Sequence, residues 1–410
     1  MSAPVRVVAL DLGEALPDLD TGGGRYRYGR VFAFAGDVPV GEVRLELPAT
    51  AAQVAQALRA AGLDPPAVLD PPADLHPPVA AVREDQAELP LVSVVVATDL
   101  ARPKALDRCL AALVRQDHPR YEVVVVANGP RARRAEPPTL PPMVRLVGQP
   151  RPGVSAARNR GVAESAGEIV AFTDDDAAPA PGWLRAIAGR FAAEPDAAAV
   201  TGLVLPGELE TPAQVWFEDS GNAFRQRYRP ASFAGGPHVV RDRLADDPSA
   251  PHAIYAMGPF GTGCNLAVRR GVLQRLGGFD RALGPGTPTR AGEDLLLLLR
   301  LLAGGGRLAY EPSAVVWHWH RDQARQLRQQ VSGFGRGFTA MLTAAVLDDP
   351  RHLPALIRTR RLRANAETAV SRTVTALDAP PAWLTRARRA GELTGPIAYL
   401  AARLRMLWWR

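Results

Sequence analysis

The sequence predicts an α/β fold: a mostly parallel sheet with helices on both faces. Two observations in the 410-residue chain support this. Continuous apolar runs rich in β-branched residues, such as LVSVVVAT at 91–98 and YEVVVVAN at 121–128, are typical of strands buried on both faces. Segments with helical spacing separate these runs, and strands that alternate with helices form parallel sheets.

The first part of the chain indicates a separate small module. Residues 1–63 hold two short alternating segments, RVFAFAG at 30–36 and GEVRLELP at 41–48, followed by a helical pattern at 50–62. Proline is frequent in residues 64–90, a composition typical of a semi-rigid linker. We therefore predict a β-rich N-terminal module at 1–63 and a linker at 64–90.

The main α/β domain is predicted at 91–340. Its first half should alternate strands and helices, with strands at 91–98, 121–128, 143–149 and 168–173 and helices at 103–116 and 153–165. The fourth strand ends at three consecutive aspartates, TDDDA. Ligands of parallel sheets collect at the carboxyl ends of the strands, so this is where we expect the binding site.

Composition limits the class of function. Cys109 and Cys264 are the only cysteines, too few for a disulfide framework, which fits a reducing compartment. The first residues lack the basic start of a secretory signal and no run of about 18 apolar residues occurs, so we expect a cytoplasmic protein. The single lysine, Lys104, is not in a GxxxxGK[ST] loop, and the chain has no zinc-finger or RNA-recognition signature. Nucleic acid is therefore not an expected partner.

A basic helical region is predicted at 341–410. Residues 351–410 contain 12 arginines against three acidic residues, and the chain ends in GPIAYLAARLRMLWWR at 395–410. Arginine beside Trp408 and Trp409 suits an anionic membrane surface, so peripheral contact with the inner face of the membrane is one expectation. A basic helix packed on the body of the protein is the alternative.

The three aspartates point to a bound cation. Adjacent like charges repel, so such a cluster needs either open water or a cation. Asp174 and Asp176 lie two apart and could both reach one complex of Mg²⁺ or Mn²⁺ with the phosphates of a nucleotide. The alternative is an acidic loop that caps the following helix.

Four motifs, in this order along the chain, resemble family 2 glycosyltransferases. They are VSVVVATDLARPKALDRCLAALVRQDHPRYEVVVVANGP at 92–130, PGVSAARNRGVAESAGEIVAFTDDDAAPAPGWL at 152–184, GTGCNLAVRRGVLQRLGGFDRALGPGTPTRAGEDLLLLLRLLAGGG at 261–306 and AYEPSAVVWHWHR at 309–321. The resemblance implies a GT-A fold and an inverting transfer of a sugar from a nucleotide-diphosphate donor. It also implies Mn²⁺ or Mg²⁺ bound at a DxD motif.

The resemblance assigns expected roles to residues of the first two motifs. Asp176 matches the metal ligand of the DxD motif, and Asp174 its partner on the metal's water shell or the donor ribose. Asp175 is the variable middle position and is expected near the donor. Thr98 and Arg158 match donor-binding positions. Arg158 would pair with a phosphate or hold Asp174, and a purely structural ion pair is its alternative role.

The last two motifs carry the expected base and a pair of histidines. Asp294 matches the general base that takes the proton from the acceptor hydroxyl, and Glu293 is expected to orient it or the acceptor. Capping of the helix is the alternative role for this acidic pair. His318 and His320 lie two apart on a predicted strand, so both imidazoles should lie on one face. One of them is expected to complete the metal site or hold the leaving diphosphate.

One position departs from the family pattern. Members commonly carry an aspartate near the end of the second strand that binds the donor base, and here Ala127 occupies that position. Asn128 or Asp99 would then supply the contact, or the donor is not a uridine nucleotide. A UDP-sugar remains the first expectation for the donor, and the sequence does not indicate the acceptor.

Two other functions are considered. A sugar nucleotidyltransferase should have a glycine-rich basic loop after the first strand, which VVVATDLARPKAL at 94–106 lacks. A non-catalytic relative that binds nucleotide or acceptor has only Ala127 in its favour.

Overall fold

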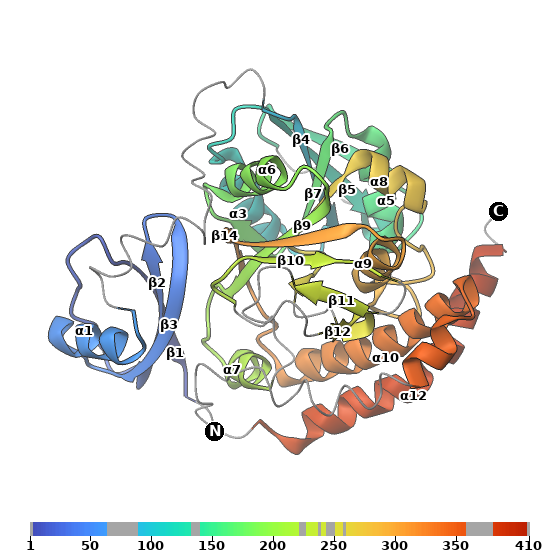
Figure 1. Cartoon of the computed structure of the whole chain (residues 1–410). Coiled ribbons are helices and arrows are strands. Elements are labelled where there is room, and N and C mark those ends of the chain that lie inside the picture. The colour runs from blue at the N-terminus through green and yellow to red at the C-terminus, as the bar shows by residue number, and fades with distance from the viewer. Residues whose placement is uncertain are drawn as a thin grey trace.

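The computed structural model describes residues 3–63, 89–132, 140–220, 227–236, 239–242, 251–256, 260–357 and 380–407. They form a small N-terminal sheet with one helix, a large α/β body and two long C-terminal helices (Figure 1). Nearly all of the expected linker at 64–90 lies outside the described residues, as do Trp408 and Trp409.

The N-terminal module is β-rich, as predicted. Its elements are β1 (Val5–Asp11), β2 (Tyr28–Ala35), β3 (Val38–Glu46) and α1 (Ala51–Ala60). The central strand, β2, runs parallel to β1 and antiparallel to β3. A capping box starts α1, in which the Thr50 side chain accepts a hydrogen bond from the Gln53 backbone N–H. Val54 and Leu58 of α1 are fully buried in the module's own core.

One mixed sheet of eleven strands forms the body. Its order is β12-β11-β10-β14-β9-β13-β7-β4-β5-β6, with β8 paired to β14. The strands are β4 (Val92–Thr98), β5 (Tyr121–Asn128), β6 (Val144–Gln149), β7 (Ile169–Asp174), β8 (Ala177–Pro179), β9 (Ala197–Pro206), β10 (Ala231–Ala234), β11 (Val239–Asp242), β12 (Pro251–Ala253), β13 (Leu266–Arg269) and β14 (Arg307–His318). The four strands from β7 to β6 are parallel, and β14 is parallel to β9. β13 runs antiparallel to both β7 and β9. The predicted fold class is confirmed, and the antiparallel strands make the sheet mixed.

Helices bury both faces of the central strands. Before the two long C-terminal helices, the helices of the body are α3 (Pro103–Val114), α4 (Gly129–Ala132), α5 (Val154–Glu164), α6 (Trp183–Ala193), α7 (Pro212–Asp219), η2 (Ile254–Ala256), α8 (Arg270–Leu276) and α9 (Glu293–Ala303). Val94 and Val96 of β4 share a core with α3 and α6, whereas Val95 between them shares a core with α5, α8 and α9. A Cβ on Gly161 of α5 would lie 2.3 Å from a Val95 methyl carbon, so glycine lets this helix approach the strand closely.

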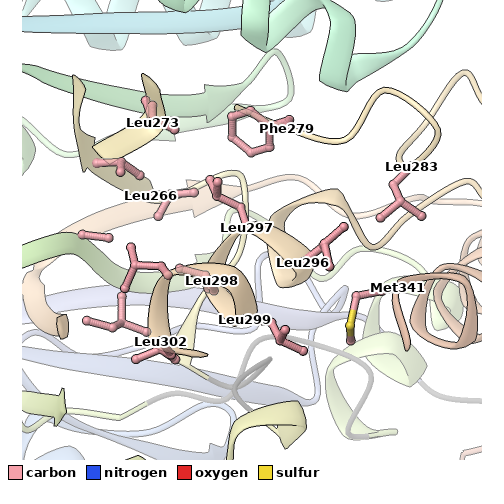
Figure 2. Packing of buried hydrophobic residues seen from close by; sticks show 14 of the residues in the cluster. Leu266, Leu273, Phe279, Leu283, Leu296, Leu297, Leu298, Leu299, Leu302 and Met341 are labelled. Carbon is pink, nitrogen blue, oxygen red and sulfur yellow. The ribbon is translucent and has the colours of Figure 1, made fainter. Parts of the chain in front are cut away.

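The helix α9 is buried along most of its length. Figure 2 shows Leu296, Leu297, Leu298, Leu299 and Leu302 of α9 among Leu266, Leu273, Phe279, Leu283 and Met341. Its N-cap, Gly292, has a left-handed φ of 97°, and a Cβ there would lie 2.4 Å from the Gly337 carbonyl oxygen. The start of α9, which carries the acidic pair, is therefore pressed against the next helix.

Two long helices, α10 (Ala324–Asp348) and α12 (Ala382–Leu407), lie side by side on the outside of the body (Figure 1). Glycines allow the close contact, because a Cβ on Gly391 would lie 2.0 Å from the Ser332 carbonyl oxygen. The basic region expected at 341–410 thus contains α12 and the last turns of α10. Among helices in the described part of the chain, none has both the length and the hydropathy needed to cross a bilayer.

Candidate metal and acid–base site

Two aspartates and a histidine meet where β7 and β14 end. Asp174 is the last residue of β7, and Asp176 is followed by β8, whose antiparallel pairing places Ala177 opposite His318 at the end of β14. One ligand atom from each of Asp174, Asp176 and His318 lies within 4.8 Å of the other two. Carboxylates suit Mg²⁺ and Mn²⁺, whereas imidazole nitrogen suits transition metals, so this donor set fits Mn²⁺ better than Mg²⁺.

Asp176 is buried among positive groups. Its Oδ1 lies 3.4 Å from His318 Nε2, its Oδ2 lies 3.5 Å from Arg321 Nη1, and Arg102 donates a hydrogen bond to Oδ2. Burial alone would raise the pKa of Asp176, but His318, followed by Arg102 and Arg321, holds that pKa well below its usual range. The carboxylate is therefore ionised and available as a ligand.

Asp175 shares the guanidinium of Arg102 with Asp176 and also binds Thr98. Thr98 Oγ1 donates to its Oδ2 at 2.7 Å, and Arg102 Nη2 donates to its Oδ1 at 2.7 Å. Burial raises the pKa of Asp175 to about 6. Asp175 and Thr98 thus bind each other and join the aspartate loop to the end of β4. The expected contacts of both residues with the donor stay predictions.

Arg158 connects the aspartates to the acidic pair. From the buried face of α5, Nη2 lies 3.0 Å from Asp174 Oδ1 and Nη1 lies 2.9 Å from Glu293 Oε1. Nη2 also donates to the Gly263 carbonyl oxygen at 3.2 Å. Arg158 therefore holds Asp174, one of the roles expected for it, while the side chain of Asp174 remains 34% exposed.

The acidic pair begins α9, and its two members differ in surroundings. Glu293 is buried, and burial together with the nearby charge of Asp294 raises its pKa to about 7, although Arg158 acts in the opposite direction. Asp294 is only half-buried. Its Oδ2 accepts from the Gly263 backbone N–H at 2.7 Å, and its Oδ1 accepts from the Leu295 N–H at 2.8 Å. These two donors fix the orientation of a carboxylate that solvent still reaches.

His318, and not His320, meets the aspartates. The strand ends at His318, so His320 lies just beyond it, yet the two Nδ1 atoms are 3.2 Å apart. His320 Nε2 lies 2.6 Å from Glu218 Oε1 of α7. Burial lowers the pKa of both rings, but the charge of Asp176 outweighs burial at His318 and raises its pKa.

The residues expected to replace the missing base-binding aspartate are placed differently. Asn128 Nδ2 donates to the Thr98 carbonyl oxygen at 3.1 Å, and its Oδ1 accepts from the Gly153 N–H at 3.3 Å. Asp99 is exposed and accepts from the Ala101 N–H. Of these two side chains, Asp99 is the more accessible to a ligand.

Three residues at this site were not predicted from the sequence. Arg102 stands directly before Pro103 in the loop after β4, and a cation in that loop was a signal that could have been used. Arg321 directly follows the second histidine. Glu218 belongs to no recognisable motif, since it reaches His320 from 102 residues earlier in the chain.

Comparison with known proteins shows that part of this chain is similar to one protein family. Residues 93–277 match the family model described as "Glycosyl transferase family 2". Pre-mycofactocin glycosyltransferase of Mycobacterium tuberculosis strain H37Rv is 31% identical over 173 residues, which are 42% of this chain and 31% of that protein. Succinoglycan biosynthesis protein ExoM of Rhizobium meliloti strain 1021 is 29% identical over 217 residues, 51% of this chain and 60% of that protein. The chain therefore spans less than two thirds of the length of either relative.

Solved structures are also similar to this chain, among them a mannosyltransferase. The mannosyltransferase PcManGT from Pyrobaculum calidifontis, in complex with GDP-Man and Mn²⁺, is 20% identical with a TM-score of 0.44, and the likeness covers 80% of this chain and 89% of that one.

Proposed function

We propose, from the premise that this chain carries a domain of glycosyl transferase family 2, that it transfers a sugar from a nucleotide-diphosphate donor to an acceptor hydroxyl or amine with inversion. The observation that carries the proposal is the group formed by Asp174, Asp176 and His318. It lies at the carboxyl end of the parallel strands, where nucleotides bind in open α/β sheets.

We assign the cation to this group, as Mn²⁺ or, less suited to the imidazole, Mg²⁺. Two carboxylate oxygens and one imidazole nitrogen would hold it, leaving further positions for diphosphate oxygens. When bound, the ion neutralises charge on the departing nucleotide diphosphate. His318 thereby takes the metal role expected of one of the two histidines.

Asp294 is the proposed general base. Its carboxylate takes the proton of the acceptor hydroxyl, whose oxygen bonds to the anomeric carbon as the bond from that carbon to the diphosphate breaks. The backbone N–H groups of Gly263 and Leu295 hold the carboxylate in place during this step. Glu293 and Arg158 fix the position of this acidic pair relative to Asp174.

The donor is proposed to be a UDP-sugar. Ala127 is buried opposite Thr98 and its side chain offers the base no polar atom, so the contact is assigned to Asp99 or Asn128, of which Asp99 is the more exposed.

Binding of nucleotides tests the donor and cation assignments. Isothermal titration calorimetry with UDP, GDP and dTDP, each with and without Mn²⁺, is expected to show metal-dependent binding of one nucleotide. Asp176→Asn should abolish this metal-dependent binding of the nucleotide. Asp196→Asn is the matched control, because Asp196 is an exposed aspartate that pairs with Arg307 away from the site. Metal-independent binding, or no binding of any nucleotide, would contradict the proposal.

Turnover tests the base. Asp294→Asn should keep nucleotide and Mn²⁺ binding but lower the rate of sugar transfer by about 100-fold or more, the usual contribution of a general base. If the wild-type protein binds the nucleotide but neither transfers nor hydrolyses any UDP-sugar offered, a non-catalytic binding protein becomes the better description.

We further propose that α12 contacts an anionic membrane surface, through the region expected at 395–410. The face of α12 opposite its buried residues carries an exposed apolar stripe formed by Leu393, Ile397, Leu400, Leu404 and Leu407. Exposed arginines such as Arg403 accompany it. Apolar side chains flanked by arginine suit insertion at the boundary of anionic lipid headgroups.

Vesicle sedimentation tests this contact. Binding to vesicles with phosphatidylglycerol should exceed binding to phosphatidylcholine alone and should weaken as salt rises. Leu400→Asp with Leu404→Asp should remove it, whereas Val114→Asp, at an exposed apolar residue of α3, should not. Equal binding of both variants would refute the assignment to α12.

A further inference from the structure

Buried ion pairs join the N-terminal module to the body. Arg30 of β2 donates from Nε to Glu42 Oε2 at 2.6 Å and from Nη1 to Glu218 Oε2 at 2.6 Å. The side chains of Arg30, Glu42 and Glu218 are 4%, 5% and 2% exposed. Beside them, Arg44 of β3 pairs with Asp219. Removing one partner of a buried pair leaves an uncompensated charge, so loss of any one of these residues should weaken the contact between α7 and the module.

Apolar contacts extend the same junction to the strand that carries His318. Phe32 and Phe34 of β2 lie with their ring centroids 5.9 Å and 6.4 Å from that of Trp317, the residue before His318. The Val5 N–H donates to the Leu209 carbonyl oxygen at 2.8 Å, just before α7. Figure 1 shows the module beside α7. The module therefore contacts both β14, which ends at His318, and α7, whose Glu218 contacts His320.

A chain of polar contacts runs from this junction to the aspartates. Glu218 Oε1 lies 2.6 Å from His320 Nε2, His320 Nδ1 lies 3.2 Å from His318 Nδ1, and His318 Nε2 lies 3.4 Å from Asp176 Oδ1. The other oxygen of Glu218, Oε2, accepts a hydrogen bond from Arg30. The chain thus connects the N-terminal module to the proposed cation site through two imidazoles.

The chemistry of each contact sets where the protons lie. An ionised carboxylate only accepts, so the nitrogen of His320 that faces Glu218 carries a proton. In a neutral ring the other nitrogen, Nδ1, is then an acceptor, and His318 must donate to it from its own Nδ1. Because His318 donates from Nδ1, its other nitrogen, Nε2, which lies 3.4 Å from Asp176 Oδ1, is the one that can give up its proton when a cation binds. The neutral ring that results is the tautomer that can bind a cation.

We propose that Glu218, held by Arg30 of the N-terminal module, is a positioning residue that selects the metal-binding tautomer of His318. The proposal rests on the proposed function, since it assumes that a cation binds Asp174, Asp176 and His318. It gives the N-terminal module a part in metal binding although no residue of the module touches the metal ligands in the contacts described above.

The test compares substitutions of the two glutamates, Glu218 and Glu42, that pair with the guanidinium of Arg30. In Glu218→Gln, Arg30 still requires an oxygen, so the amide NH₂ turns to His320 and reverses the direction of donation, which places a proton on His318 Nε2. Glu42→Gln is the matched control, because Glu42 is equally buried and pairs with the same arginine but contacts neither histidine in the network described. Both variants lose one buried charge from the same cluster.

The first readout is Mn²⁺ affinity of the full chain, measured by calorimetry. Groups that orient a metal-bound histidine typically contribute 10- to 100-fold to metal affinity. We expect a loss of that size in Glu218→Gln and less than about a twofold loss in Glu42→Gln, with similar decreases in Tm. Equal losses of Mn²⁺ affinity in the two variants would make the effect structural and would overturn the proposal.

The second readout needs no variant. In the wild-type chain with diamagnetic Mg²⁺, ¹⁵N shifts of the histidines should show His320 protonated at Nε2 and not at Nδ1. A proton on His320 Nδ1 would overturn the proposal even if Glu218→Gln does not fold. The two proposals can fail separately. If Asp176→Asn keeps the wild-type affinity for Mn²⁺, the cation site is refuted. If Asp176→Asn loses Mn²⁺ affinity but Glu218→Gln keeps the wild-type affinity, only the role of Glu218 is refuted.

Discussion

The buried carboxyl of Glu293 should make the stability of the protein depend on pH. Its pKa in the folded protein is raised to about 7, from 4.5 in an unfolded chain, because burial and Asp294 disfavour its charge. Below pH 4.5 both states hold the proton, and the buried neutral carboxyl costs nothing further. As pH rises towards 7 the unfolded state releases its proton first, so stability falls through this window and then stays low.

The size of this effect follows from the shift. A pKa raised from 4.5 to about 7 corresponds to about 3 kcal/mol of unfolding free energy, most of which is lost between pH 5 and pH 8. Glu293→Gln mimics the protonated carboxyl at every pH. The variant should therefore gain stability relative to wild type by most of this amount, roughly 2–3 kcal/mol, as pH rises over this range.

Urea unfolding followed by tryptophan fluorescence at pH 5, 6, 7 and 8 measures the difference between the two proteins. Taking the difference removes the contribution of all other groups that titrate alike in both. Asp349→Asn is the control, since its Arg351 partner lowers the pKa of Asp349 to about 2 and its difference from wild type should not change above pH 5. A wild-type-minus-variant difference for Glu293→Gln that is flat with pH would refute the reasoning.

Three further substitutions test other contacts. In Gly263→Ala the new Cβ would lie 2.5 Å from the Arg158 guanidinium, so a displaced arginine should lower the transfer rate by about 100-fold, with kcat as the measurement and wild-type kcat as the refuting result. Gly391→Val should force α12 away from α10 and lower the unfolding free energy by about 1–3 kcal/mol, while the same change at exposed Ala390 should have little effect. Arg102→Ala removes a cation from Asp176, so calorimetry on the nucleotide-free protein should show Mn²⁺ binding about fivefold tighter, and weaker binding would mean that Arg102 organises the site.

The sequence was sufficient for the four parallel strands from β4 to β7 and for the position of the aspartates. The continuous β-branched runs of β4 and β5 could only be buried strands, and a polar cluster at the end of β7 then had to lie at the carboxyl edge of the sheet. The resemblance to the family also indicated Asp294 and Arg158. Arg158 forms ion pairs with Asp174 and Glu293, and both Arg158 and Asp294 hydrogen-bond to the backbone of Gly263.

Side-chain contacts between distant segments could not be predicted in the same way. β13 has only four residues, too few for a periodic pattern to reveal that it reverses the direction of the sheet. Arg102 reaches the aspartates because its side chain is long, and Glu218 meets His320 only after α7 packs against the N-terminal module. Each of these features depends on tertiary packing, which local sequence periodicity does not predict.

The leucine helix α9 has a consequence for how this protein and its relatives diverge. Its buried positions are filled by leucine on several sides, and aliphatic side chains of similar volume replace one another in a core at a cost below about 1.5 kcal/mol. Most residues of α9 can therefore be replaced by other aliphatic residues during evolution without a shift of the helix axis. Glu293 and Asp294 have no such substitutes, because volume alone cannot reproduce their contacts with Arg158 and Gly263. An alignment of related sequences should consequently show two invariant acidic residues followed by apolar residues whose identity varies.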